Sequence, residues 1–323
     1  MQQNSQPAIA IPSLGLSTGD PAGIGPEISL CAALHPQLRE MCRFVLFGDW
    51  EMLRCRAENL GLAFDFVRMP HDSLKRGAPI TDHVIVDIPA AKEQIFPGVG
   101  SRASGESAAQ NVIACAEACN NGVLSAMVTA PLNKACLNEA GYSFAGHTEF
   151  LAHLTGASEV GMAFLTDRLK LVLATVHLPL REAIHLLSSD LILKKLNLLL
   201  REFGRFGLPC KRVAVAALNP HAGEMGLLGG EEQEKIMPAI QEAKRLFPDF
   251  EFTGPLPADT LFHRAYQGEF DAVLALYHDQ GLIPIKLLGF GQAVNVTLGL
   301  PFVRTSVDHG TAFDIAGKGL ADP

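Results

Sequence analysis

The chain has 323 residues, long enough for two domains of ordinary size or one large one. Its formal net charge of −8 argues against a general nucleic-acid binder, which needs a basic face for phosphates. No run approaches the roughly 18 apolar residues of a membrane span, and the N-terminal stretch lacks the features of a signal peptide. The seven cysteines include no CxxC pair, which predicts reduced thiols in a cytoplasmic protein. Cys115 and Cys119, four residues apart, are an alternative half of a metal site.

Apolar runs typical of strands alternate with amphipathic helical runs along the chain. This alternation predicts an α/β protein with a largely parallel sheet, because strands covered on both faces have nearly continuous apolar runs. The predicted strands lie at residues 10–17, 43–48, 64–69, 83–88, 125–130, 161–166, 169–176, 212–218, 250–254, 271–277 and 292–298. The clearest predicted helices lie at residues 26–41, 104–122, 189–207 and 231–247.

Two glycine-rich loops are candidates for a nucleotide site. The stretch "GDPAGIGPE" (19–27) lies between the first strand and the first helix, where a dinucleotide fingerprint belongs. It lacks the third glycine of that fingerprint and the Lys of a P-loop, so it predicts a tight turn whose helix N-terminus could hold an anion. The stretch "GVGSRA" (98–103) fits G-x-G-x-x-A but follows no clean strand. The sequence therefore leaves the cofactor-binding residues unknown.

Three histidines follow three of the predicted strands. They are His177 after 169–176, His221 after 212–218 and His278 after 271–277. Ligands of parallel α/β sheets bind at the carboxyl ends of the strands, so we expect these imidazoles to lie close together. Three neutral nitrogens suit Zn²⁺ or another divalent transition ion. Taken singly, each histidine has a simpler interpretation as a hydrogen-bonded structural residue.

Other polar residues mark candidate substrate contacts. His147 and Thr148 stand at a helix start, where Thr148 either caps the helix or joins His147 in holding an anion. Lys286 interrupts an apolar run and either extends to solvent or binds an anionic group. Asn295 interrupts a strand and needs hydrogen-bond partners, and Arg304 follows that strand, where it could clamp an anion.

Two aspartates complete the set of polar candidates. Asp259 most simply caps the helix that begins there. Asp279 follows His278 and either orients an imidazole or caps the next helix.

Eight stretches, taken in order, resemble the 4-hydroxythreonine-4-phosphate dehydrogenase (PdxA) family of vitamin B6 (pyridoxine) biosynthesis. They are "STGDPAGIGPE", "VTAPLNK", "GHTEFLA", "HLPL", "NPHAGE", "GPLPADTLF", "YHDQGLIPIK" and "RTSVDHGTAFDIAGKG", and they run from residue 17 to residue 319. The resemblance implies an isocitrate/isopropylmalate dehydrogenase-like fold. Its two α/β/α domains would be residues 1–134 plus 305–323 and residues 135–304, with the active site in the cleft between them. It also implies a homodimer that shares its metal site between subunits.

The resemblance further implies an oxidoreductase that uses NAD, or NADP, and a divalent metal, with zinc favoured over cobalt and magnesium. The reaction would oxidise 4-phosphooxy-L-threonine at C3 and then release CO₂ to give 3-amino-2-oxopropyl phosphate. The implied metal ligands are His177, His221 and His278. The implied substrate contacts are His147, Thr148, Lys286, Asn295 and Arg304, with Lys286 as the catalytic group that assists proton transfer.

Several alternatives stay open on the sequence alone. Relatives with the same chemistry act on 4-phospho-D-threonate, D-erythronate 4-phosphate or aromatic cis-dihydrodiols. Three histidines alone would also permit a nucleotide-independent, metal-dependent hydrolase or decarboxylase, or a non-catalytic protein that binds a phosphorylated metabolite. Family members usually continue through a final helix after the stretch "GKGLADP", so we expect this sequence to lack that helix.

Overall fold

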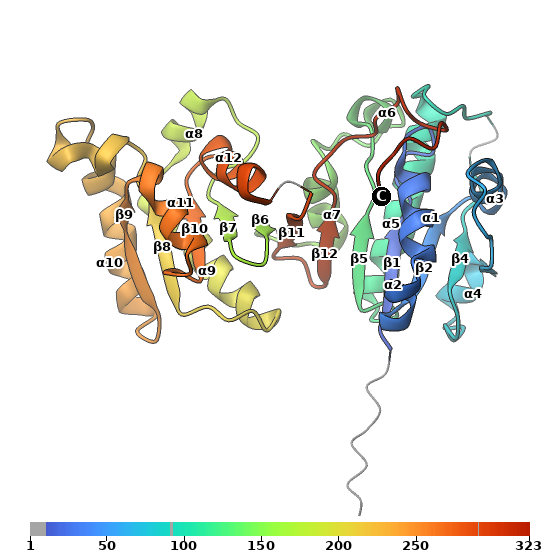
Figure 1. Ribbon diagram of the computed structural model, residues 1–323, viewed down its shortest axis with the longest axis horizontal. Coiled ribbons are helices and arrows are strands. Elements are labelled where there is room, and N and C mark those ends of the chain that lie inside the picture. The colour runs from blue at the N-terminus through green and yellow to red at the C-terminus, as the bar shows by residue number, and fades with distance from the viewer. Residues whose placement is uncertain (1–10, 91–92, 290) are drawn as a thin grey trace, which may run out of the picture. The chain divides into compact units, whose positions relative to one another are not determined.

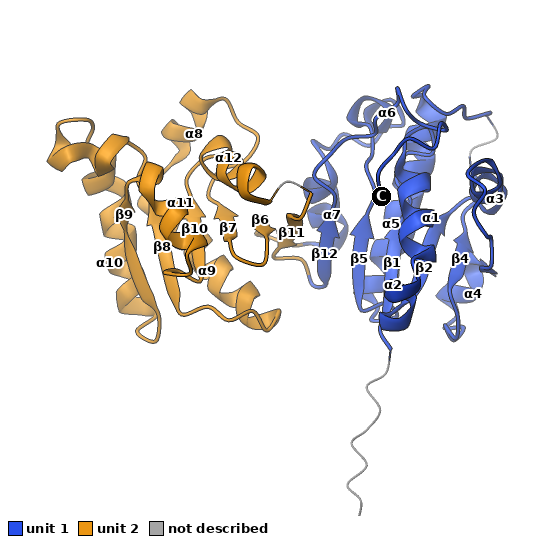
Figure 2. Cartoon of the chain, in the orientation of Figure 1, with its two compact units in different colours: residues 1–156, 301–323 blue, residues 157–300 orange. Residues whose placement is uncertain are grey.

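The computed structural model describes residues 11–90, 93–289 and 291–323, which form two compact units (Figures 1 and 2). Unit 1 is Met1–Gly156 with Pro301–Pro323, and unit 2 is Ala157–Leu300. The predicted domain boundaries lie at 134/135 and 304/305. The structural boundaries differ because helix α7 (His147–Thr155) packs on α5 (Arg102–Asn120), and strand β12 (Val303–Ser306) pairs with β5 (Ala126–Thr129). His147, Thr148 and Arg304 therefore belong to unit 1.

Unit 1 contains a fully parallel arrangement of strands in the order β3-β4-β2-β1-β5-β12. The strands not yet given are β1 (Ser13–Ser17), β2 (Arg43–Gly48), β3 (Val67–Pro70) and β4 (Val84–Asp87). Strand β12 was not predicted. Arg304 follows the predicted strand 292–298, as expected, and it lies inside β12, where it is in register with Met127 of β5.

Helices cover both faces of the unit 1 strands. They are α1 (Gly25–Leu34), α2 (Pro36–Met41), α3 (Trp50–Asn59), α4 (His71–Lys75), α5, α6 (Lys134–Glu139) and α7. Side chains alternate between faces along a strand. Leu16 of β1 packs into the cluster formed with α1 and α3, whereas Gly15 faces α5, where a Cβ would lie 2.5 Å from Cys115 Sγ. The predicted helix 26–41 is divided at His35, because a residue before proline is held in extended backbone.

The loop "GDPAGIGPE" forms the tight strand-to-helix turn that was predicted for it. Gly19 has φ +72°, and a Cβ on Gly19 would lie 2.3 Å from Pro131 O. A Cβ on Gly25, the first residue of α1, would lie 2.3 Å from Thr18 O. The second glycine-rich stretch, 98–103, includes the start of α5, and the Ser101 side chain accepts a hydrogen bond from Ser104 N and caps this helix.

Unit 2 has the strand order β11-β6-β7-β10-β8-β9. Its strands are β6 (Gly161–Leu165), β7 (Lys170–Leu173), β8 (Arg212–Ala216), β9 (Glu251–Leu256), β10 (Ala272–Ala275) and β11 (Val294–Leu298). The parallel prediction is correct for β7, β10, β8 and β9, but β6 runs antiparallel to both β7 and β11. Only residues 166–169 join β6 to β7, and such a short connection can only form a hairpin.

Helices also cover both faces of the unit 2 strands. They are α8 (Leu180–Leu186), α9 (Ser189–Arg205), α10 (Met237–Leu246), α11 (Ala258–Tyr266) and α12 (His278–Gly289), with short helical turns η1 (Pro220–Gly226) and η2 (Glu232–Ile236). Helices α9 and α10 pack on the face that carries Val213 and Val215. Helices α11 and α12 pack on the face that carries Ala214 and Ala216. No helix in the described part of the chain is long and apolar enough to span a membrane.

Candidate functional site

His177 and His278 lie side by side in unit 2. They follow β7 and β10, which are neighbouring parallel strands. Their ring centroids are 5.4 Å apart and the ring planes meet at 44°. The carboxyl ends of adjacent parallel strands therefore bring these two imidazoles together, as the strand pattern led us to expect.

Buried polar side chains connect the strand ends that carry these histidines. Thr175 Oγ1 donates a hydrogen bond of 2.7 Å to Leu276 O, which ties the end of β7 to the end of β10. Gln280 Oε1 accepts from Leu276 N at 2.7 Å, and its Nε2 donates to Ala217 O at 2.6 Å. Gln280 thus joins the end of β10 to the end of β8, which leads to His221. Thr175 is 3% exposed and Gln280 is 7% exposed, so water competes little with these bonds.

His221 begins an unusual left-handed turn within η1. The φ angles of residues 221–225 are 50°, 55°, 77°, 42° and 56°. Only Gly223 among them lacks a Cβ, and left-handed backbone costs other residues roughly 1–2 kcal/mol each. Strained backbone of this kind persists only where the surroundings hold it, and it is concentrated at functional sites.

Carboxylates hold one ring nitrogen on two of the three histidines. His221 Nδ1 lies 2.6 Å from Glu224 Oε1, and His278 Nδ1 lies 2.7 Å from Asp279 Oδ1. The Glu224 hydrogen bond and charge raise the pKa of His221, with a smaller contribution from the charge of Asp259. A histidine whose Nδ1–H donates to a carboxylate presents Nε2 as a metal ligand, and this arrangement is common at metal sites.

The two aspartates have different roles. The contact of Asp279 with His278 supports its interpretation as a group that orients an imidazole. The capping prediction for Asp259 is wrong: Pro257 is the N-cap of α11, without a side-chain cap, and Asp259 lies inside the first turn. The negative charge of Asp259 instead helps to raise the pKa of His221.

Among the residues that the structure describes, the three predicted ligands do not form a metal-binding group. Within residues 11–90, 93–289 and 291–323, no group of three or more His, Cys, Asp or Glu side chains is close enough to hold an ion. The structure brings His177 and His278 together and places His221 on its own turn. The metal-binding role of all three stays a prediction.

Lys286 and Asn295 are the other candidate residues of unit 2. Lys286 is exposed on α12, roughly two helical turns after His278. Asn295 lies in β11, and its side-chain Oδ1 is buried without a hydrogen-bond partner among the described residues. An unpaired buried carbonyl oxygen is costly, so this atom marks a place where a ligand could donate a hydrogen bond.

A second polar group lies in unit 1, where β12 pairs with β5. Arg304 is only 3% exposed, and its Nε and Nη2 donate to Thr129 Oγ1 at 3.1 and 2.5 Å. His147 and Thr148 are the first two residues of α7. The interpretation of Thr148 as the helix cap is wrong, because Gly146 is the N-cap and no side chain caps the helix.

The electrostatics of this group favour an anionic ligand. Burial lowers the pKa of Arg304 to about 10, against the opposing charge of Glu149, so the guanidinium remains charged near neutral pH. Burial, and to a smaller extent the charge of Arg304, lower the pKa of His147 well below its usual value, so the ring is neutral near neutral pH. His147 Nε2 is buried without a partner among the described residues. A fixed cation, a neutral ring, a hydroxyl and the first turn of α7 together suit a phosphate or carboxylate.

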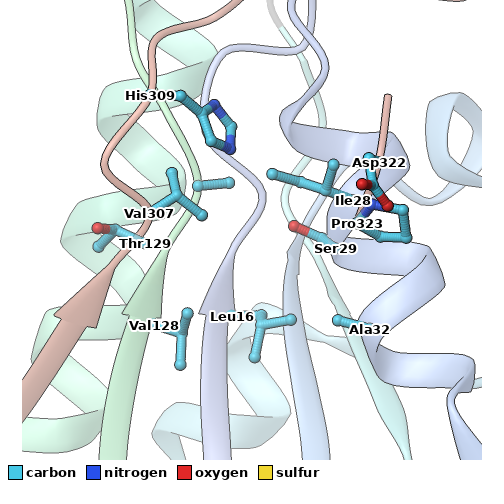
Figure 3. A pocket seen from close by; sticks show the side chains of 11 residues that line it. Leu16, Ile28, Ser29, Ala32, Val128, Thr129, Val307, His309, Asp322 and Pro323 are labelled. Carbon is cyan, nitrogen blue, oxygen red and sulfur yellow. The ribbon is translucent and has the colours of Figure 1, made fainter. Parts of the chain in front are cut away.

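Unit 1 also contains an apolar cavity of about 130 Å³ between the strands and α1 (Figure 3). Its walls come from the carboxyl-end residues of β1 and β5, from α1 and from the chain after β12. The lining residues are Leu16, Ile28, Ser29, Ala32, Val128, Thr129, Ala130, Val307, His309, Asp322 and Pro323. Sequence reasoning missed this cavity, because its walls come from segments far apart in the chain.

Known proteins match this chain over both units. The family model described as "Pyridoxal phosphate biosynthetic protein PdxA" matches residues 40–323, which include all eight predicted site residues. A 4-hydroxythreonine-4-phosphate dehydrogenase of Desulfosudis oleivorans is 44% identical over 96% of this chain and 92% of its own length. A D-threonate 4-phosphate dehydrogenase of Cupriavidus necator is 40% identical over 97% of this chain and 93% of its own. The crystal structure of 4-hydroxythreonine-4-phosphate dehydrogenase from Klebsiella pneumoniae has a TM-score of 0.87 at 38% identity, covering 97% of this chain and 94% of that one.

Proposed function

Because the chain belongs to the PdxA family, we propose that it oxidises a small 4-phosphorylated hydroxy acid with a nicotinamide cofactor. The first candidate substrate is 4-phosphooxy-L-threonine, which would be oxidised at C3 by NAD⁺ and then decarboxylated to 3-amino-2-oxopropyl phosphate. The observation that carries the proposal is the pair His177 and His278 at adjacent strand ends, in a chain whose relatives are named as dehydrogenases of such substrates.

We assign the phosphate group of the substrate to the unit 1 group. Arg304 is held by Thr129 and supplies a buried positive charge, and the neutral His147 adds a ring nitrogen that has no protein partner among the described residues. Charge-assisted hydrogen bonds of this kind are stronger than neutral ones. In this assignment Thr148 donates its hydroxyl to the same anion.

We assign the metal to the three histidines of unit 2. These side chains fit a divalent metal ion, because Glu224 and Asp279 bind Nδ1 of two rings and leave Nε2 available as a ligand. Three imidazoles favour Zn²⁺ or Co²⁺, whereas Mg²⁺ would need water and substrate oxygens to complete its ligands. A divalent ion bound there would supply Lewis acidity to the C3 hydroxyl and to the carbonyl that replaces it.

Lys286 is our candidate for proton transfer. Oxidation sends a hydride from C3 to the nicotinamide and releases the hydroxyl proton, which Lys286 Nζ would accept when uncharged. Decarboxylation then breaks the C1–C2 bond, releases CO₂ and leaves an electron pair at C2, to which the same Nζ would return the proton. General acid–base groups of this kind contribute roughly 10²–10⁴-fold to rate.

The unit 1 cavity is our candidate place for the nucleotide base, whether the cofactor is NAD or NADP. Its volume of about 130 Å³ is comparable to that of an engineered cavity that binds one aromatic ring. It lies near the carboxyl ends of parallel strands, where α/β proteins bind nucleotides, and apolar side chains such as Leu16 and Val128 form its walls.

A homodimer in the cytoplasm completes the proposal. Apolar side chains are exposed close in sequence to the histidines: Met225 is 92% exposed and Leu227 80% near His221, and Ile283 is 65% exposed and Leu287 81% on α12. Exposed apolar side chains in such numbers favour coverage by a second copy of the chain, which would also bring metal ligands of two subunits together. All seven cysteines are free thiols, as in reducing compartments.

D-threonate 4-phosphate is the second candidate substrate. Relatives named for it and relatives named for 4-hydroxythreonine 4-phosphate match over similar lengths, at 40% and 44% identity in the two examples above. The deciding experiment is a panel of phosphorylated hydroxy acids with NAD⁺ or NADP⁺, each with Zn²⁺, Co²⁺, Mn²⁺ and Mg²⁺. We expect reduced nucleotide to form with one of the two substrates. Turnover without any nucleotide, or binding without turnover, would overturn the proposal in favour of a hydrolase or decarboxylase, or of a binding protein.

A further inference from the structure

Glu232 is a buried carboxylate beside the turn that carries His221. It lies at the start of η2 and is 3% exposed. Its Oε1 accepts hydrogen bonds from the backbone N–H groups of Leu218 at 2.9 Å and Asn219 at 2.7 Å. Its Oε2 accepts from Asn219 Nδ2 at 3.0 Å. Glu232 therefore fixes the two residues through which the chain enters the turn.

The same carboxylate contacts the centre of the turn. Gly223 is buried, has φ +77°, and a Cβ on it would lie 2.7 Å from Glu232 Oε2. The backbone at Gly223 thus packs directly against the carboxylate, with no side chain between them. Glu232 supports the turn at its entry and at its middle, and both supports lie within three residues of His221.

The neighbouring acidic residues differ from Glu232 in what they contact. Glu231 Oε2 accepts a hydrogen bond of 2.8 Å from Asn219 Nδ2, so it adds one bond at the entry of the turn. Glu234 is exposed and lies against Gly230 instead. Glu234 therefore offers a control with the same side chain and the same charge in the same segment.

From these contacts we infer that Glu232 is a positioning residue, which holds residues 221–225 in the left-handed turn and thereby sets where the His221 ring lies. This inference rests on the proposed function, in which His221 binds the metal ion. Left-handed backbone is unfavourable for the four non-glycine residues among 221–225, so the turn relaxes when its support is removed. The ring then leaves the position from which Nε2 can bind, although no metal ligand has been changed.

The first test measures the turn itself, in metal-free full-length protein. Glu232→Gln keeps the size of the side chain but weakens its acceptors, and Glu234→Gln makes the same change at the exposed position. We expect the amide protons of Leu218 and Asn219 to exchange at least about tenfold faster in Glu232→Gln than in the wild type or in Glu234→Gln. Equal exchange in all three proteins would overturn the inference.

The second test measures metal affinity, by titration of Zn²⁺ or Co²⁺ against a competing chelator. Loss of a group that orients a ligand typically weakens binding roughly 10–100-fold, and we expect that loss in Glu232→Gln but not in Glu234→Gln. In a His221→Ala background the effect of Glu232→Gln should disappear, because Glu232 acts through His221. An equal loss in both backgrounds would show a general effect on the fold and would overturn the inference.

The two tests separate failure of the inference from failure of the proposed function. If the wild type binds neither Zn²⁺ nor Co²⁺ at the histidines, the proposed metal site is wrong. Glu232 then cannot position a metal ligand, even if the exchange rates show that it stabilises the turn. If Glu232→Gln does not fold, Asn219→Ala removes one hydrogen-bond partner of Glu232 and should weaken metal binding in the same direction. Unchanged metal affinity in Asn219→Ala would then overturn the inference.

Discussion

Replacing Arg304 with lysine tests the assignment of the substrate phosphate to unit 1. Lys keeps the positive charge but loses the planar fork that binds an anion through two hydrogen bonds. Arg304 is 3% exposed, and two hydrogen bonds to Thr129 Oγ1 orient its side chain. A lysine at this buried position cannot extend into solvent, and it cannot present two donors in the same plane as arginine does. One lost hydrogen bond to a charged group is worth about 1.5–3 kcal/mol. We therefore expect kcat/KM to fall about 10- to 150-fold.

The assay compares the phosphorylated substrate with the same hydroxy acid lacking its phosphate. The loss in Arg304→Lys should appear with the phosphorylated substrate and largely vanish with the other one, because the missing hydrogen bond goes to the phosphate. Arg245→Lys, on an exposed arginine paired with Glu242, provides the control. Equal losses for both substrates would refute the assignment, as would full activity with a folded variant. Thermal unfolding of each variant shows whether the buried lysine has disturbed the fold.

Four further predictions concern the two groups and the cavity. The folded-state pKa of His147 lies below the unfolded value of about 6.5, so the unfolded chain binds the extra proton, and stability is full above that pH and falls as pH drops through it. His147→Gln should therefore reduce the loss of unfolding free energy on acidification, measured by urea unfolding; parallel pH curves for variant and wild type would contradict this. Glu224→Gln removes the contact that raises the pKa of His221 and should weaken Zn²⁺ binding roughly 10–100-fold in a chelator competition, and unchanged affinity would count against the pairing. Lys286→Ala should lower turnover at saturating substrate by roughly 100-fold or more, whereas normal turnover would remove its proposed role. Ala32→Leu should fill the cavity and raise KM for the nucleotide about tenfold or more, because a base that is no longer buried loses about 1.5–3 kcal/mol of binding free energy. KM for the phosphorylated acid is the control and should not change.

The strand–helix alternation was sufficient to predict the fold class but not the division into units. Strand β12 carries Arg304, and nothing in the short stretch around it has the apolar run of a buried strand. The strand forms because it pairs with β5, and the hydrogen bonds from Arg304 to Thr129 span 175 residues of sequence. A contact over that distance follows from the fold as a whole. For the same reason β12, the strand that carries Arg304, was not predicted.

The left-handed turn shows a second limit of reading a sequence by pattern. Residues 221–225 contain one glycine, and a pattern based on turn residues would not predict five consecutive positive φ angles there. The cause lies 11 residues beyond His221, in the buried carboxylate of Glu232, whose partners are set by how η2 packs against the end of β8. A residue that supports a ligand through the backbone has no fixed spacing from it.

The candidate ligands and the residues that hold them therefore differ in how far the sequence reveals them. His278 could be predicted as a candidate ligand because an imidazole that follows an apolar strand of a parallel sheet lies near the carboxyl ends of the strands, where ligands bind. Gln280, two residues later in the same motif, could not be interpreted in that way, because its partner Ala217 is 63 residues distant. Yet Gln280 joins the strand ends that carry His278 and lead to His221, and Glu232 fixes the turn between β8 and η2. If metal affinity depends on ring position as strongly as on ligand identity, substitutions at these supporting residues will tune the site while every histidine stays in place.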